Sequence, residues 1–169
     1  PGPLSGIRVI ELADEQAEYC GLTLAGLGAD VIKVEPPGGN STRRIGPFYE
    51  DEPGPERSLF FWQYNRGKRS IVLDLDQEKD RERFRTLVST ADVLLESTPK
   101  GELDRLGLGI DTLRRQTPSL IVARVTPFGD EGPWSDFKSC DLVHLALGGV
   151  MMNCGYDPAP GGKYDLPPI

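Results

Sequence analysis

Short apolar runs alternate with amphipathic stretches along most of this chain, and the alternation predicts strands and helices in turn. The apolar runs are rich in valine, isoleucine and leucine. They are mostly apolar on both faces, as is typical of buried parallel strands. The predicted strands are residues 8–12, 30–34, 70–74, 93–96 and 120–125.

Helical periodicity fills the segments between these runs, at residues 15–27, 77–90, 103–106, 112–116 and 141–150. The first segment places Cys20, Leu24 and Leu27 on one stripe, which predicts Cys20 as a core residue. The second directs its charged run toward solvent and an apolar stripe inward, namely Phe84, Leu87 and Val88. The last is apolar on nearly all sides, with Ser139 as its predicted N-cap.

The order of these elements predicts an α/β fold. Strands alternate with helices, so we expect an open, mainly parallel sheet of five or six strands with helices on both faces. Residues 38–58 are the exception, because they combine prolines and glycines with an acidic run. They predict a mobile surface loop without regular elements, and loops of this length are often functional.

Composition narrows the partners of the chain. A formal net charge of −7 argues against duplex nucleic acid, although a local basic pocket for a small anion is still compatible with it. No apolar run is long enough to predict a membrane span, and no secretory signal is recognisable. Three cysteines and one histidine do not form the usual ligand set of zinc, so no metal is expected, and the odd cysteine count suits a cytoplasmic protein.

The two ends of the sequence also shape the expectation. The chain begins with Pro1 rather than methionine, and the proline-rich sequence of residues 158–169 predicts a loop that leads into a further apolar segment. We therefore expect it to be a piece of a longer polypeptide.

Candidate chemistry is found in the loops that follow the predicted strands, where doubly wound sheets bind their ligands. These loops are residues 13–18, 35–39, 96–101 and 126–133. The motifs GxGxxG and GxxxxGKS/T do not occur, so a conventional dinucleotide or P-loop site is not predicted. Basic residues near these loops could bind phosphates or a carboxylate of a ligand, and the alternative is that they form ion pairs with acidic residues of the chain. They are Arg43, Arg44, Arg66, Lys68, Arg69, Lys100 and Arg105.

Six segments, in order along nearly the whole chain, resemble the class III CoA-transferase family, which includes formyl-CoA transferase, L-carnitine CoA-transferase and alpha-methylacyl-CoA racemase. They are residues 3–12, 28–39, 65–71, 91–96, 103–107 and 128–133. The resemblance implies a Rossmann-like large domain, of which residues 1–169 would be the N-terminal, CoA-binding part. It also implies a second domain beyond this chain and a homodimer of interlocked chains.

The resemblance further implies coenzyme A or an acyl-CoA as substrate, bound along the strand-end loops. Glu15, Gln16 and Ala17 match the CoA-contacting loop after the first strand. Asn65, Lys68 and Arg69 match the adenosine and phosphate end of the site. The remaining matched positions are Ser97, Thr98 and Lys100 in a third loop, Arg105, and Phe128 and Gly129 in the last motif. Glu18, Thr98 and Cys140 depart from the usual family pattern.

The family's chemistry uses a nucleophilic aspartate that takes up the acyl group. The resemblance puts this residue just beyond Ile169, after the Pro168–Ile169 pair, so no catalytic residue is assigned within the chain. Asp165 precedes that pair and is expected to cap a loop. Two alternatives stay open: an acyl-CoA racemase, which the absence of histidine at Cys140 opposes, and a non-catalytic homologue that binds CoA or acyl-CoA.

Overall fold

The computed structural model of the chain describes residues 2–153. The chain divides into two compact units, Pro1–Thr126 and Pro127–Ile169. The first unit contains all the strands of the described residues, and the second contains the last helix.

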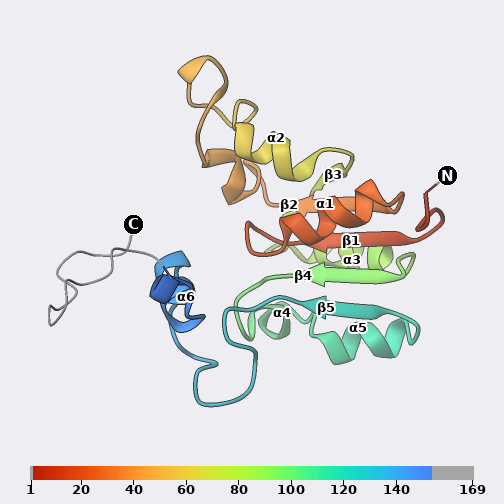
Figure 1. Cartoon of the computed structure of the whole chain (residues 1–169). Coiled ribbons are helices and arrows are strands. Elements are labelled where there is room, and N and C mark those ends of the chain that lie inside the picture. Colours follow the sequence, from red (N-terminus) through yellow and green to blue (C-terminus); the bar gives the residue numbers. More distant parts are fainter. Residues whose placement is uncertain (1, 154–169) are drawn as a thin grey trace, which may run out of the picture. The chain divides into compact units, whose positions relative to one another are not determined.

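Five parallel strands form one sheet in the order β3-β2-β1-β4-β5 (Figure 1). They are β1 (Arg8–Leu12), β2 (Asp30–Glu35), β3 (Arg69–Val72), β4 (Val93–Glu96) and β5 (Ile121–Arg124). The predicted α/β fold with a parallel sheet is therefore confirmed. The strand order reverses direction between β1 and β4, which makes this junction the switch point of the sheet.

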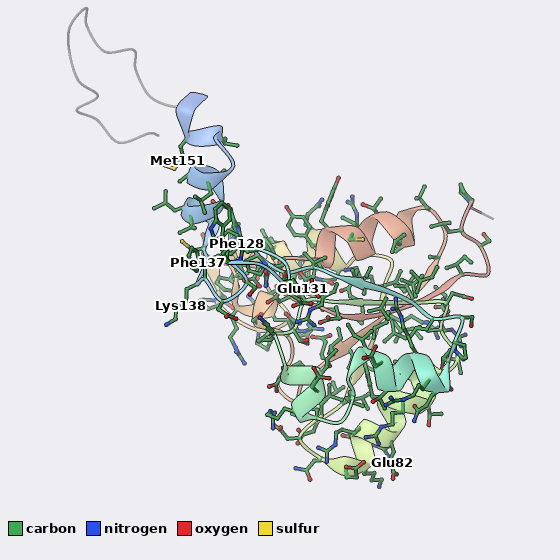
Figure 2. All side chains as sticks on the ribbon, turned by 90° about the horizontal axis from the view of Figure 1, so that it is seen from below. Glu82, Phe128, Glu131, Phe137, Lys138 and Met151 are labelled. Carbon is green, nitrogen blue, oxygen red and sulfur yellow. The ribbon has the colours of Figure 1, made fainter. Side chains whose placement is uncertain are left out.

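Helices cover both faces of the sheet, as predicted. Helix α1 (Glu18–Gly26) packs on the face that carries Val9, Val31 and Leu95, which we call the α1 face. Three helices pack on the opposite, three-helix face: α3 (Glu78–Val88), α4 (Glu102–Arg105) and α5 (Ile110–Gln116). Figure 2 shows α1 and α5 on opposite sides of the sheet, with Glu82 of α3 pointing away from it.

The three-helix face holds the larger apolar core. Ile10 and Leu94 from the strands meet Phe84 and Val88 from α3 there, and all four are at most 1% exposed. The predicted inward stripe of α3 is thus confirmed. Successive residues of a strand point to opposite faces, so Val9 and Glu11 turn to the α1 face while Ile10 turns to this one.

The predicted inward stripe of α1 is right for Leu24, which packs against the core of the α1 face, but wrong for its other two residues. Cys20 is exposed rather than in the core, and Leu27 is 41% exposed. Ala17, Glu18 and Gly21 are buried instead. The helix turns these residues toward the sheet because buried charged side chains lie beneath it, and a pattern of apolar residues does not reveal such a partner.

The segment 38–58 contains structure that the sequence did not predict. It forms two 3₁₀ turns, η1 (Ser41–Arg44) and η2 (Tyr49–Asp51). Helix α2 (Leu59–Asn65), which was also not predicted, follows directly and is capped by Ser58, whose hydroxyl accepts a hydrogen bond from the amide of Phe61. The expectation of a loop without regular elements is therefore wrong.

The edge strands differ from the central ones. All four residues of β3 are exposed, and Ile121 of β5 is 62% exposed. Neither apolar core includes a residue of β3, so the prediction of burial on both faces is wrong for this strand.

The second unit contains α6 (Asp141–Leu147) and the turn η3 (Val150–Asn153). Helix α6 ends before the predicted residue 150, since Gly148 is its C-cap and Gly149 has φ of 79°. Cys140 rather than Ser139 is the N-cap, which corrects that prediction. Within residues 2–153, no helix is both long and apolar enough to cross a membrane.

Candidate functional site

The loops that follow β1 and β4 meet at the switch point of the sheet. Leu12 and Glu96 are the last paired residues of these strands. Directly beyond them, the amide of Asp14 donates a hydrogen bond to the Ser97 hydroxyl (3.0 Å), and this hydroxyl donates to the Asp14 carboxylate (2.8 Å). The two predicted CoA loops, containing Glu15–Ala17 and Ser97–Lys100, are thereby joined side by side.

The residues of the first of these loops differ in exposure. Glu15 and Gln16 are exposed beyond the end of β1, whereas Ala17 is buried and occupies the N-cap position of α1. The amide of Gln16 donates a hydrogen bond to the Asp14 carboxylate at 3.1 Å. The loop therefore offers exposed groups directly at the switch point.

The second loop is held by a buried carboxylate at the end of β4. Both the amide and the hydroxyl of Thr98 donate hydrogen bonds to Glu96 Oε2, at 2.8 and 2.7 Å. The other oxygen of Glu96 is paired with Arg124 of β5. Lys100 is exposed two residues farther along this loop.

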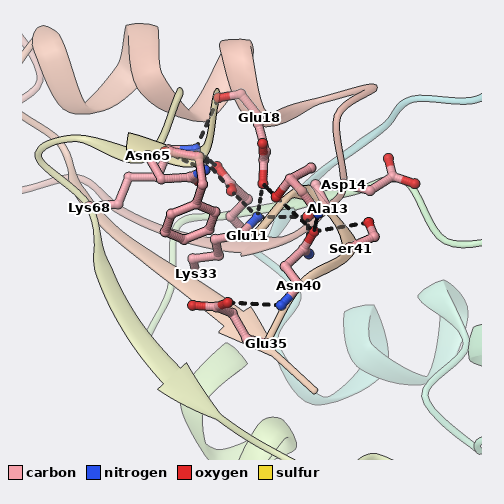
Figure 3. Close-up of polar contacts among 12 residues, drawn as sticks. Glu11, Ala13, Asp14, Glu18, Lys33, Glu35, Asn40, Ser41, Asn65 and Lys68 are labelled. Atoms are coloured by element: carbon pink, nitrogen blue, oxygen red, sulfur yellow. Dashed lines mark hydrogen bonds and ion pairs between the residues drawn. The ribbon is translucent and has the colours of Figure 1, made fainter. Parts of the chain in front are cut away.

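A cluster of four buried ionic residues lies between α1 and the sheet (Figure 3): Glu11, Glu18, Lys33 and Lys68, here called the Lys33 cluster. Glu11 and Lys33 are direct neighbours on β1 and β2. Lys33 Nζ lies 3.0 Å from Glu11 Oε1 and 2.7 Å from Glu18 Oε1. Two ammonium groups and two carboxylates balance, so burying them leaves no net charge in the interior.

Lys68 is part of this cluster rather than of an open loop. Its side chain is 2% exposed. Its ammonium group donates to Glu11, to the backbone carbonyl of Glu18 at 3.0 Å and to the Asn65 side chain at 3.0 Å. All three donors of the ammonium group thus point at protein acceptors. Burial lowers the pKa of Lys68, and the neighbouring Glu11 opposes this shift.

Glu35, at the end of β2, is a second buried carboxylate beside the loops. Arg43 holds it with both Nε (2.6 Å) and a terminal nitrogen (2.8 Å), while the amide of Asn40 donates to it at 3.0 Å. Burial disfavours the charged form, but hydrogen bonds from Arg43, Ser70 and Asn40 outweigh it and lower the pKa of Glu35 to about 2. This carboxylate is therefore fixed as an anion.

A cavity of about 240 Å³ opens at the carboxyl ends of β1, β2 and β3, next to α4. Leu12, Val34 and Leu73 contribute apolar walls, and Asp76 and Glu102 line it as well. Arg105 is 58% exposed and pairs with these last two residues, at 3.2 and 2.7 Å. Glu102 and Asp76 raise the pKa of Arg105, so its charge is permanent.

The other predicted site residues lie elsewhere. Arg69 is the first residue of β3 and pairs with Asp30, the first residue of β2, at 2.6 Å. Both residues therefore lie at the amino ends of their strands, opposite to the edge with the predicted CoA loops. Phe128 and Gly129 belong to the second unit, where the Phe128 ring meets those of Trp134, Phe137 and His144 edge to face. Asp165 and the position after Ile169 lie outside the described residues.

Sequence reasoning overlooked Glu11, Lys33, Asn40 and Glu96 as supports of these loops. A signal was present, because charged residues interrupt otherwise apolar strands at Glu11, Lys33 and Glu35. In a strand buried on both faces, such a charge needs a buried partner. Within residues 2–153, no group of three or more metal-binding side chains converges.

Comparisons with known proteins identify relatives over nearly the whole chain. Subunit BbsE of the succinyl-CoA:(R)-benzylsuccinate CoA-transferase from Thauera aromatica is 44% identical over 153 residues, covering 90% of this chain and 37% of that protein. The succinate–glutarate CoA-transferase of Agrobacterium fabrum is 45% identical over 157 residues, covering 90% of this chain and 39% of that protein. The chain thus spans about two-fifths of the length of these curated relatives.

A solved structure agrees with these matches. The crystal structure of a CAIB/BAIF family protein from Brucella suis superposes with a TM-score of 0.85 at 41% identity, covering 99% of this chain and 43% of that one. The model of the family described as CoA-transferase family III matches residues 4–167. By this match, the chain belongs to CoA-transferase family III.

Proposed function

We propose that this chain is the N-terminal, CoA-binding part of a longer enzyme that transfers coenzyme A between carboxylic acids. The family match over residues 4–167 carries the proposal. The relatives from Thauera aromatica and Agrobacterium fabrum are CoA-transferases by name, so we extend that reaction class to this protein. The substrates would be an acyl-CoA and a free carboxylate, and the enzyme would be a cytoplasmic homodimer.

The joined loops at the switch point support this reaction class. Coenzyme A is long, with a phosphorylated adenosine at one end and a thiol at the other, and it needs a site that extends over several strand ends. The exposed residues Gln16 and Lys100 lie in the two loops tied by Asp14 and Ser97. We propose that these loops hold the CoA chain.

Arg105 is the cation we propose for a phosphate of CoA. It stands beside the cavity at the strand ends, and its present partners are the carboxylates of Asp76 and Glu102. Exposed ion pairs of this kind contribute little to stability, because water and salt screen them. A phosphate that accepts a bidentate hydrogen bond from the guanidinium can therefore displace them.

The chemistry we propose is covalent catalysis by an aspartate located after Ile169. Its carboxylate attacks the thioester carbonyl of the acyl-CoA, forming a mixed anhydride and releasing the CoA thiolate. The thiolate then attacks the aspartyl carbonyl, which releases the donor acid and leaves an aspartyl-CoA thioester. The acceptor carboxylate reverses the two steps and departs as the new acyl-CoA. Residues 1–169 alone would hold CoA without performing the transfer.

Calorimetric titration of the full-length polypeptide with CoA tests the binding part of the proposal. We expect Arg105→Gln to weaken CoA binding about 10-fold, the equivalent of one lost charged hydrogen bond. Arg83→Gln is the matched control, because Arg83 is also 58% exposed and also paired with a carboxylate, but lies on α3 away from the cavity. No binding of CoA by the wild type would overturn the proposal.

Trapping tests the chemistry. The full-length polypeptide is incubated with an acyl-CoA, treated with hydroxylamine or borohydride, and digested for peptide mapping. We expect one modified aspartate shortly after Ile169. Modification of Asp165 would refute that placement, and CoA binding without any modification would support the non-catalytic alternative.

A further inference from the structure

The backbone carbonyl of Ala13 accepts hydrogen bonds from two buried side chains that are distant in sequence. Lys33 Nζ lies 2.7 Å from this oxygen and Asn40 Nδ2 lies 2.9 Å from it (Figure 3). Ala13 is the first residue after β1, directly before the loop that we propose to contact CoA. The direction in which the chain leaves the sheet is therefore set by these two donors.

The same ammonium group also holds the far end of that loop. Besides Ala13, Lys33 binds the carboxylate of Glu18, at 2.7 Å, and Glu18 is the first residue of α1. The loop between Ala13 and Glu18 is thus clamped at both ends by one side chain, which is itself 1% exposed. The Thr42 hydroxyl, which donates to Glu18 Oε1 at 2.7 Å, extends this contact to the segment after β2.

Lys33 itself has no freedom to shift. Its three acceptors, on Glu11, Ala13 and Glu18, match the three donors of an ammonium group. Lys68 fixes Glu11 in turn, and Asn65 fixes Lys68. Asn65 and Lys68 thus connect the turn before β3 to the same cluster.

Stability alone is a poor reason for such a cluster. Replacing a buried ion pair by apolar residues of similar volume is often neutral or stabilising, and the opposite face of this sheet is filled in that apolar way. An ionic cluster differs in that its hydrogen bonds specify direction, whereas apolar contacts do not. Here the directed bonds end on the two residues that bound one loop.

We propose that Lys33 is a positioning residue, which holds the loop between Ala13 and Glu18 in its CoA-binding conformation without touching CoA. The inference rests on the proposed function, since it concerns the same site. Asn40 acts with Lys33 on the Ala13 carbonyl. Within the cluster, Lys68 holds Glu11 in place and is itself held by Asn65. These two residues thus affect CoA binding through the cluster and do not contact a phosphate of CoA directly.

The test compares two variants of the full-length polypeptide, Lys33→Met and Asn40→Ala, by two measurements. Hydrogen exchange reports on the amides of residues 14–18, and titration reports the affinity for CoA. In Lys33→Met we expect faster exchange at these amides and a loss of CoA affinity of about 10- to 100-fold, as small displacements of positioning groups can cause. Asn40→Ala removes one of the two donors to Ala13 without unbalancing the buried charge, so it should give a smaller change at the same amides.

Val88→Ala is the control for lost stability, because Val88 is buried on the three-helix face and belongs to no strand-end loop. At a similar drop in Tm it should leave exchange at residues 14–18 and the affinity unchanged. Equal effects in Val88→Ala, or wild-type exchange in both Lys33→Met and Asn40→Ala, would overturn the inference. A wild type that binds no CoA would instead refute the proposed function, and the exchange data would still decide whether Lys33 positions the loop.

Discussion

The two faces of the sheet are built on different principles. The three-helix face is a continuous apolar core around Phe84, Leu94 and Leu113. The α1 face combines a smaller apolar core with fully buried Glu11, Glu18 and Lys33. Apolar packing has no preferred direction, whereas each ionic hydrogen bond has one. The three-helix face therefore mainly supplies stability, whereas the α1 face fixes the geometry of the loop after β1.

The largest loss of stability should come from truncating a side chain in the apolar core of the three-helix face. Phe84 is 0% exposed in its centre, so Phe84→Ala removes a ring that the surroundings cannot replace. We expect the free energy of unfolding to fall by about 3–5 kcal/mol, measured by urea denaturation. The CoA affinity of the protein that stays folded should be unchanged. A clear drop in that affinity would show that the core of the three-helix face also controls the CoA loops.

Lowering the pH should have the next largest effect on stability. This effect should arise on the α1 face, because that face carries Glu35. The folded-state pKa of Glu35, about 2, lies below its ordinary value of 4.5. Its charge therefore stabilises the fold fully above pH 4.5, and this contribution is lost as the pH falls from 4.5 toward 2. At neutral pH we expect Glu35→Gln to cost on the order of 3 kcal/mol.

The measurement is the urea midpoint of wild type and Glu35→Gln between neutral and acidic pH. The gap between the two proteins should narrow as the pH falls. A gap that stays constant with pH would show that the carboxylate is not held as an anion by Arg43, Ser70 and Asn40.

A smaller effect is expected where α1 crosses the Lys33 cluster. A Cβ on Gly21 would lie 1.6 Å from Glu11 Oε2 and 3.1 Å from Lys68 Nζ. Gly21→Ala must therefore displace the helix or the carboxylate, at a cost of about 1–3 kcal/mol in the free energy of unfolding. A stabilised Gly21→Ala protein would contradict this close approach.

Gly26 provides the matched control in the same helix. A Cβ at this position meets nothing within 4 Å. Gly26→Ala should therefore be neutral or raise stability by up to about 1 kcal/mol, because alanine favours the helix more than glycine does.

The smallest effect on stability should come from Arg105, at the exposed end of the three-helix face. Its partners Asp76 and Glu102 are themselves 73% and 37% exposed, so Arg105→Gln should leave the free energy of unfolding nearly unchanged. A thermal melt measures the stability of Arg105→Gln and the CoA titration measures its affinity, so the two effects can be separated. A clear loss of stability in Arg105→Gln would make Arg105 a structural residue rather than a binding one.

The sequence predicted the sheet well because its signal is local. Central strands such as β1 and β4 are short apolar runs, and their bounds agree with the prediction. Helix α2 was missed because its aromatic residues, at 59–65, have no clear apolar stripe and follow a segment rich in proline and glycine. Cys20 was placed on the wrong side of α1 because a pattern of apolar residues does not reveal that the helix covers the charged side chains of Glu11 and Lys33.

The candidate site was predictable only in part. Strand-end loops could be recognised in the sequence, and the structure joins two of them through Asp14 and Ser97. The roles of basic side chains could not be read in this way. Lys68, Arg69 and Arg105 look alike in a sequence, but one is buried with Glu11, one pairs with Asp30 and one stands beside the cavity. Which partner a long cation reaches depends on the fold, not on its neighbours in the chain.

The pairing of Glu11 with Lys33 across β1 and β2 has a consequence for folding. A slip of one residue between two parallel strands would still leave apolar side chains opposite one another, so Val and Ile alone discriminate poorly between registers. The charges remove this ambiguity, since a one-residue slip would turn an ionic side chain toward the apolar core of Phe84 and leave its counter-ion on the opposite face. The buried ion pair thus selects the correct register of the two strands, because it makes the misaligned sheet much less stable than the correct one.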